Sequence, residues 1–319
     1  MNLLEEREYY KPFNYPWAFK YYKQQQHMHW LPDEVNLADD LKDYREKMSK
    51  GNKRLLGQIF RFFTQADVDV CCGYAKHYLP TFKQPEVRMM LAAFAAMEAV
   101  HQEAYSLLLE TLGFRDDEYQ KFFKHKEMLD KHEYLGNFGM KTPMDIAKTM
   151  AIYSAFTEGV QLFSSFAILL NFPRHNLMKG MGQIVTWSVR DETLHVEGMS
   201  HLFRVFIQEN PELWTDDLKY EIYCAAERTV ELEDAFIDLC FEGAEVPDLT
   251  AEEIKEYIRY IADRRLLGLG MKKIFGSDVN PLPWLDYMLN GVEHTNFFEN
   301  RATEYSRAST TGNWQDIFK

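Results

Sequence analysis

The sequence has no basic surplus, no paired cysteines and no apolar leader, and each absence excludes a class of protein. Its 319 residues include 36 lysines and arginines against 49 aspartates and glutamates, a formal net charge of −13. Nucleic acids and anionic membranes bind basic surfaces, so we expect no nucleic-acid partner and no membrane partner. The four cysteines form no Cys-x-x-Cys pair, which predicts free, buried thiols in the reducing cytoplasm. The N-terminus is acidic, whereas an export signal begins basic and then turns apolar.

Apolar residues recur every three to four positions through most of the chain, a spacing that predicts helices. We expect helices over residues 55–78, 86–112, 143–171, 175–208, 211–241 and 250–268. Residues 1–36 mix three prolines with aromatics and predict an irregular arm, and the polar residues 115–141 predict a crossover segment with a surface helix. Residues 143–171 are long and apolar enough to cross a membrane, but polar interruptions and soluble flanks favour a buried helix. The sequence therefore predicts an all-α protein.

The stretch Met89–Gln102 is rich in strong helix formers and almost free of charge. Between Arg88 and Glu103 its only charged residue is Glu98, which stands three residues before His101, so both lie on one helix face. An ionised carboxylate left unpaired in an apolar core is strongly destabilising. Glu98 is therefore protonated, paired with a cation or bound to a metal.

A second Glu-x-x-His occurs at Glu192 and His195, in the fourth expected helix. The spacing alone is a weak signal, because acids are common in this chain. Asp67 and Glu158, however, also lie on apolar helix faces, so four helices each present a buried acid. A dinuclear metal site in a four-helix bundle requires one carboxylate from each of two helices and a Glu-x-x-His from each of the other two. The predicted ligands are Asp67, Glu98, His101, Glu158, Glu192 and His195.

The charges of this set agree with a metal site. Two divalent cations would cancel four carboxylates, and oxygen-rich ligation with one imidazole per metal favours iron or manganese over zinc or copper. Asp191 is a candidate hydrogen-bond acceptor for a ligand histidine. Taken singly, Glu158 could belong to a structural hydrogen-bond network and His101 could be an ordinary core histidine. Four buried acids without a cation would be hard to keep folded, which favours the metal.

Tyr105 lies one turn after His101 on the same face, so its phenol is expected close to the metals. Centres of this type can activate dioxygen and oxidise a neighbouring aromatic group, and a pocket poor in water would protect the product. Leu162 and Phe166 could wall such a pocket. All three residues could equally be ordinary core residues.

At these residues the chain resembles the small, radical-generating subunit of class I ribonucleotide reductase, over nearly its whole length. The resemblance is carried by Met97–His101 with Tyr105, by the lone Glu158 and by Arg190–His195. It implies a ferritin-like four-helix bundle core with additional helices, a pair of metal ions on the six ligands, and a stable tyrosyl radical at Tyr105. Iron–iron, manganese–manganese and mixed pairs are all compatible with these ligands.

The resemblance also implies how the oxidant leaves the site and where it goes. Trp30, Asp191 and His101 would form the route out. A helical body, residues 1–300, would be followed by a flexible tail, residues 301–319, that docks on the large, alpha subunit. Tyr305 would be the redox tyrosine of this tail, with Trp314 as the other candidate. The implied partners are a second copy of the chain, the large subunit and a flavoprotein activase.

The function expected from this resemblance is generation of an oxidant that starts ribonucleotide reduction in the large subunit and so supplies deoxyribonucleotides. The chain itself has no glycine-rich phosphate loop and no cysteine trio suited to a reductase active site. One alternative is a diiron oxygenase or desaturase on the same fold, which would act without a second subunit. Another is a ferritin-like storage or structural bundle, which would need a cage and many irons per chain.

Overall fold

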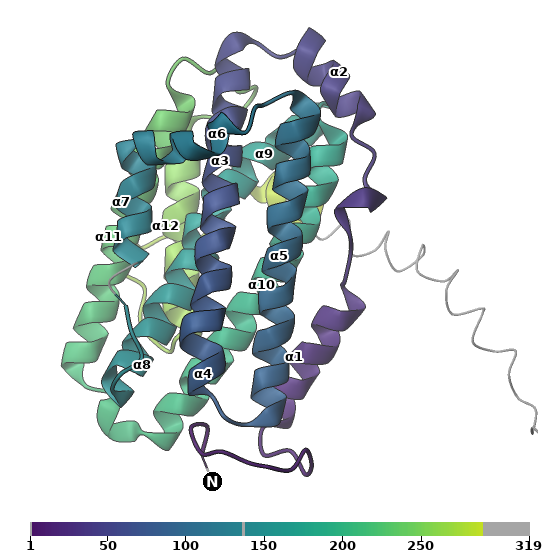
Figure 1. Ribbon diagram of the computed structural model, residues 1–319. Helices are drawn as coiled ribbons and strands as arrows, with labels where there is room; N and C mark the ends of the chain where they lie inside the picture. Colours follow the sequence, from purple (N-terminus) through teal and green to yellow (C-terminus); the bar gives the residue numbers. More distant parts are fainter. Residues whose placement is uncertain (1, 136–137, 290–319) are drawn as a thin grey trace, which may run out of the picture. The chain divides into compact units, whose positions relative to one another are not determined.

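The computed structural model describes residues 2–135 and 138–289, and every regular element in that part of the chain is helical (Figure 1). The prediction of an all-α fold is confirmed. The helices named below belong to one compact unit, Met1–Pro281, and a second unit, Leu282–Lys319, follows it. The predicted boundary between a body and a tail at residue 300 lies outside the described residues.

Four long segments form the core of the first unit. They are α3 (Lys50–Gly73), α5 (Pro85–Leu112), the run of α8 (Pro143–Thr149), η4 (Met150–Gln161) and α9 (Phe163–Arg174), and α10 (Lys179–Glu209). Helix α3 packs against α5, and α10 packs against η4, α9 and α5, so the four segments form a bundle (Figure 1). Segment η4 is a π-helix, with backbone hydrogen bonds between residues five apart.

Local sequence signals explain where these segments begin and end. The Ser49 side chain accepts a hydrogen bond from the Asn52 N–H and caps α3. Pro85 occupies the first turn of α5, where its missing N–H costs nothing, and Gly113 ends that helix with a φ of 86°. Thr142 opens α8 with a reciprocal hydrogen bond to Asp145.

The remaining helices surround this bundle. The crossover between α5 and α8 carries α6 (Asp117–Gln120), η3 (Lys121–Lys124) and α7 (Lys126–Leu135), as the polar composition predicted. After α10 come η5 (Pro211–Leu213), α11 (Asp216–Phe241) and α12 (Ala251–Gly268). Both α11 and α12 pack against η4, so the π-helix is enclosed from the side away from α10 as well.

The expectation of little regular structure in residues 1–36 was wrong. That segment contains α1 (Pro16–His27) and η1 (Pro32–Glu34), and α2 (Ala38–Glu46) follows it. Pro16 and Pro32 begin helices here because each stands in a first turn, where the fixed φ suits the helix. Helix α1 packs on α5 and α10, and its buried Gln25 side chain reaches His195 of α10.

Two smaller expectations also needed correction. Helix α9 continues to Arg174 with Pro173 in its last turn, where a missing N–H disturbs only the end of the helix. The four cysteines are free, but only Cys240 is buried, and the other three are partly exposed. The run Pro143–Arg174 is long and apolar enough to span a membrane, yet its most apolar window is entirely covered by the protein, which agrees with a core helix.

Candidate metal centre

The six predicted ligands come from all four segments of the bundle. Asp67 lies on α3, Glu98 and His101 on α5, Glu158 on η4, and Glu192 and His195 on α10. Each is at most 1% exposed. Two clusters result, in which each residue offers one ligand atom and these atoms lie within 4.8 Å of one another. One cluster is Glu98, His101 and Glu192, and the other is Glu158, Glu192 and His195.

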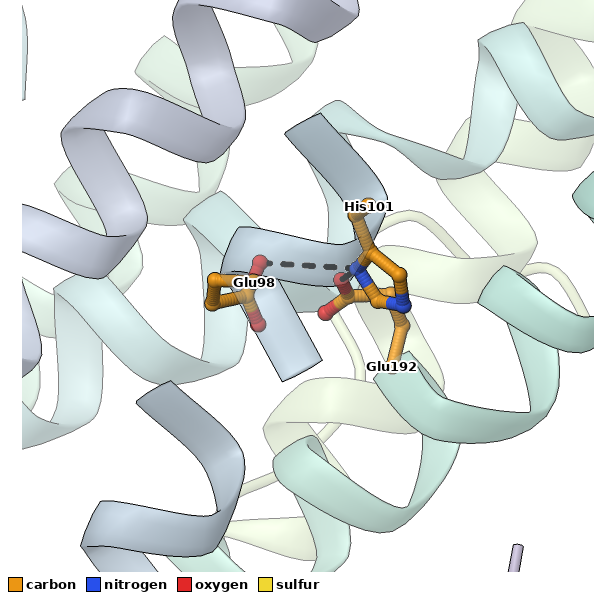
Figure 2. Close-up of side chains that lie close together, drawn as sticks. All are labelled: Glu98, His101 and Glu192. Carbon is orange, nitrogen blue, oxygen red and sulfur yellow. Dashed lines mark ion pairs between the residues drawn. The ribbon is translucent and has the colours of Figure 1, made fainter. Parts of the chain in front are cut away.

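Glu98 and Glu192 each face both histidines. The Nδ1 atom of His101 is 3.2 Å from Oε1 of Glu192 and 3.6 Å from Oε2 of Glu98. The Nδ1 atom of His195 is 2.9 Å from Oε1 of Glu98 and 3.6 Å from Oε2 of Glu192. Figure 2 shows the carboxylates of Glu98 and Glu192 turned toward the ring of His101. Because each of these carboxylates lies near both imidazoles, the arrangement is suited to two adjacent metal ions, one beside each histidine.

Most of these ligand atoms are buried without a hydrogen bond of standard geometry. No hydrogen bond of standard geometry is formed by either oxygen of Glu98 or of Glu192, by Oδ2 of Asp67, by Oε1 of Glu158 or by Nδ1 of His195, and the histidine contacts above are ion pairs. Buried polar atoms nearly always have a hydrogen-bond partner, so a group of orphaned acceptors at one point calls for a cation. Four carboxylates and two imidazoles match the preferences of iron and manganese, and the residues present fit a pair of divalent ions.

Asp67 belongs to neither of the two tight clusters, although it is close to both. Burial raises its pKa well above the ordinary value, and the carboxylates of Glu98 and Glu192 raise it further. Burial and the same two neighbours also raise the pKa of Glu158 well above its ordinary value. Without metal, protons on these two acids relieve the repulsion within the cluster.

The pKa values of the two histidines are also raised, but here burial opposes the rise instead of causing it. Burial lowers the pKa of His195, but hydrogen bonding to Glu192 and Glu98 outweighs it and raises this pKa to about 10. Burial likewise opposes a larger rise in the pKa of His101, caused by Asp191, Glu192 and Glu98. In the metal-free protein both imidazoles are therefore cations that balance part of the carboxylate charge.

A hydrogen-bond network fixes the far side of both rings. Asp191 accepts at Oδ2 from Trp30 Nε1 at 2.8 Å and from His101 Nε2 at 3.2 Å. Its Oδ1 accepts from Gln25 Nε2 at 3.0 Å, and Gln25 Oε1 accepts from His195 Nε2 at 3.0 Å. Because Nε2 of each histidine donates to this network, Nδ1 of each faces the carboxylates and is available to bind a metal ion. Despite burial, hydrogen bonds from His101 and Trp30 lower the pKa of Asp191.

Tyr105 occupies an aromatic stack beside the cluster. It is 1% exposed, and its ring stacks on Phe63 of α3 at a centroid distance of 4.4 Å. Phe63 in turn stacks on Phe166 of α9 at 5.1 Å. The Tyr105 hydroxyl has no hydrogen bond of standard geometry. Burial and the Asp67 carboxyl raise the pKa of Tyr105, so its phenol stays protonated.

Comparison with known proteins gives the family. A family model described as "Ribonucleotide reductase, small chain" matches residues 7–281. A probable ribonucleoside-diphosphate reductase small subunit of Invertebrate iridescent virus 3 is 46% identical, over 98% of this chain and 88% of the viral protein. The chain belongs to the small-chain family of ribonucleotide reductase.

Solved structures agree on the fold of this small chain. The dimanganese(II) form of Streptococcus sanguinis NrdF superposes with a TM-score of 0.73 at 23% identity, over 86% of this chain and 96% of that one. The homodimer of ribonucleotide reductase Rnr4 from Saccharomyces cerevisiae gives a TM-score of 0.76 at 18% identity, over 96% and 92%. At such identities the likeness concerns the fold alone. The resemblance to the class I small subunit is thus confirmed, and the chain acts as a small subunit of ribonucleoside-diphosphate reductase.

Two residues of this small chain were missed by the sequence analysis. Gln25 links His195 to Asp191, but it lies on α1, where no helix was expected. The Tyr74 hydroxyl donates to Oε2 of Glu158 at 3.1 Å. Tyr74 stands two helical turns after Asp67, so helical spacing from that ligand could have identified it. Tyr305 and Trp314 lie outside the described residues.

Proposed function

We propose that the six predicted ligand residues hold two divalent ions and that this small chain generates and stores an oxidant at Tyr105. The buried carboxylate oxygens of Glu98 and Glu192, which have no hydrogen bond of standard geometry, carry the proposal, because two divalent ions would satisfy all of these acceptors at one point. Such ions, when bound, supply one-electron oxidation driven by dioxygen or a reduced oxygen species. The other roles below belong to residues of the chain itself.

Tyr105 is suited to store the oxidant as a tyrosyl radical. Its ring is covered by Phe63 and is inaccessible to solvent, which keeps water and reductants away. The Asp67 carboxyl, whose charge raises the pKa of Tyr105, is the proposed acceptor of the phenol proton when Tyr105 is oxidised. The raised pKa of Tyr105 holds that proton in place until then.

Trp30, Asp191 and His101 are proposed as the route by which the oxidant leaves. The Trp30 ring stacks beside the His101 ring at a centroid distance of 6.0 Å, and both donate to Asp191. The Asp191 carboxylate can accept the Trp30 Nε1 proton when Trp30 loses an electron, so little net charge builds up along the route. The large subunit would receive the oxidant and use it to reduce ribonucleotides.

Partners and compartment follow from the family and from the sequence. We infer that two copies form a homodimer, as the yeast Rnr4 structure is described, and that residues 301–319 dock on the large, alpha subunit. Tyr305 would connect the route to that interface, with Trp314 as the other candidate. A flavoprotein activase is the third proposed partner. The free cysteines agree with a cytoplasmic protein.

The metals are proposed to be two irons, two manganese ions or one of each. The oxygen-rich ligand set accepts all three pairs. Metal analysis of protein from its native source, combined with anomalous scattering at the iron and manganese absorption edges, distinguishes them. A preparation with zinc or with one metal per chain would contradict the proposed centre.

Electron paramagnetic resonance tests the proposal directly. Protein loaded with iron or manganese and exposed to its oxidant should show a tyrosyl radical, and Tyr105→Phe should abolish that signal while metal content stays the same. Tyr78→Phe is the matched control, because Tyr78 is fully buried but hydrogen-bonds to Ser154. A Tyr105→Phe protein with an unchanged radical signal would contradict the assignment. Turnover of an organic substrate without the large subunit would instead favour an oxygenase or desaturase.

A further inference from the structure

The last turn of η4, directly after Glu158, is held by two cationic side chains from outside the bundle. Arg265 of α12 donates from Nε to the Gly159 carbonyl at 2.8 Å. Lys131 of α7 donates from Nζ to the Gln161 carbonyl at 3.3 Å, and it is also paired with the buried Glu233. Side chains from two different helices thus reach the backbone of one turn, which is unusual for the interior of a helix.

The chain geometry at this turn explains why extra donors are needed there. In a π-helix each carbonyl bonds the N–H five residues on, whereas in the following α9 it bonds the N–H four residues on. At the point where five-residue hydrogen bonds give way to four-residue ones, one backbone carbonyl of the helix is left without an N–H partner. A buried carbonyl without a donor costs about 1–3 kcal/mol. Arg265 and Lys131 supply two donors at this turn, to the Gly159 and the Gln161 carbonyls respectively.

The contact between Arg265 and Gly159 is also so close that any larger residue at position 159 would displace the Arg265 side chain. A Cβ atom at position 159 would lie 2.8 Å from Nε and 3.0 Å from Cδ of Arg265. On its other side the guanidinium lies 4.7 Å from the centroid of Phe163, the first residue of α9. Burial lowers the pKa of Arg265 to about 10, so the group is still charged at neutral pH. Arg265 is therefore fixed between the end of η4 and the start of α9.

We propose that Arg265 is a positioning residue for Glu158. By holding the Gly159 carbonyl it fixes the π-helical turn, and with it the direction in which the preceding Glu158 carboxylate points. Glu158 takes part in only one of the two clusters, the one with Glu192 and His195, while Glu98 and His101 belong to the other. Loss of Arg265 should therefore weaken one metal position and leave the other intact. This inference rests on the proposed dinuclear centre.

Titration of the metal-free, full-length protein with Mn(II), followed by electron paramagnetic resonance of the free ion, separates the two positions. Wild type should bind two Mn(II) per chain, and Glu158→Ala should identify the step that depends on Glu158. Arg265→Gln should weaken that same step by about tenfold, as changes behind a metal ligand do, without changing the other. Gly159→Ala, which crowds Arg265 from the backbone side, should have the same selective effect. Arg264→Gln is the matched control. Arg264 and Arg265 line one surface pocket, but Arg264 donates to the Tyr260 hydroxyl and not to η4.

The remaining outcomes separate the two proposals. If Arg265→Gln binds Mn(II) as wild type does at both positions, the positioning role is overturned and the proposed metal centre is unaffected. An equal loss at both positions, together with a lower melting temperature, means general destabilisation and also overturns the positioning role. Wild type that binds no Mn(II) overturns the metal centre and, with it, the role of Arg265.

Discussion

The Nε2–H of His195 donates to the side-chain oxygen of Gln25 at 3.0 Å, which ties helix α10 to helix α1 at the centre of the protein. The amide nitrogen of the same Gln25 donates to Asp191, which also accepts from His101. One glutamine therefore connects, directly and through Asp191, both histidines of the candidate metal centre. Its neighbours Gln24 and Gln26 on α1 are exposed.

The first prediction concerns Gln25 itself. Gln25→Leu leaves His195 Nε2 and Asp191 Oδ1 buried without partners, at a cost of about 1–3 kcal/mol for each. We expect a lower melting temperature in calorimetry and metal binding that is weaker by about tenfold, because the rings lose their fixed orientation. Gln26→Leu is the control on the same helix. Equal melting temperatures for Gln25→Leu and wild type would show that the network contributes nothing to stability.

The second prediction is that the stability of the metal-free protein falls as the pH rises from about 5 to about 8. The folded-state pKa values of Asp67 and Glu158 are raised, so their contribution is present below the ordinary carboxyl pKa and is lost as the pH rises through the raised values. His101 and His195 act in the same sense from their ordinary pKa upward, His195 until about pH 10. Each group that keeps its proton in the folded state but has lost it in the unfolded state lowers the stability by roughly 1.4 kcal/mol per pH unit.

Thermal unfolding across this range, with and without Mn(II), measures the effect. Bound metal should make the melting temperature less dependent on pH, because the metal replaces the protons on the ligands. Glu158→Gln should reduce the pH dependence of the melting temperature in part, since an amide does not titrate. A melting temperature of the metal-free protein that rises between pH 5 and pH 8 would contradict this account of the cluster.

The third prediction concerns Trp30. Trp30→Phe keeps an aromatic ring but removes the Nε1 donor to Asp191. We expect reductase activity with the large subunit to fall by about 10–100-fold, while metal content and the tyrosyl radical signal stay at wild-type levels. Trp187→Phe is the matched control, because the Trp187 ring packs on Trp30 at a centroid distance of 5.1 Å. If both variants lose activity equally, packing around Trp30 matters and its hydrogen bond does not.

The fourth prediction concerns residues 301–319, which lie outside the described residues. Protein that ends at residue 300 should bind metal and form the Tyr105 radical as wild type does, but it should not bind the large subunit in a pull-down or by calorimetry. Tyr305→Phe in the full chain should keep the binding and lose reductase activity. Undiminished binding by the shortened protein would place the docking surface on the helical body instead.

The sequence alone determined the helical bundle and the candidate ligands, because both depend on short-range spacing. Glu98 with His101, and Glu192 with His195, stand three residues apart, and a helix places such residues on one face whatever surrounds it. The lone acid of residues 143–171, Glu158, was recognisable because a charge in an apolar helix must have a partner. These inferences required no knowledge of which helix lies beside which.

Only the tertiary structure decided what supports those ligands. The bonds of Gln25 and Trp30 to Asp191 join residues more than 160 positions apart, and no local pattern marks such pairs. The π-helical form of η4 and the approach of Arg265 to Gly159 likewise depend on how α12 packs against it. Helical periodicity shows which face of a segment is buried, because that depends on near neighbours in the chain. The partner that meets that face depends on the packing of the whole bundle, which the spacing of residues within one helix does not contain.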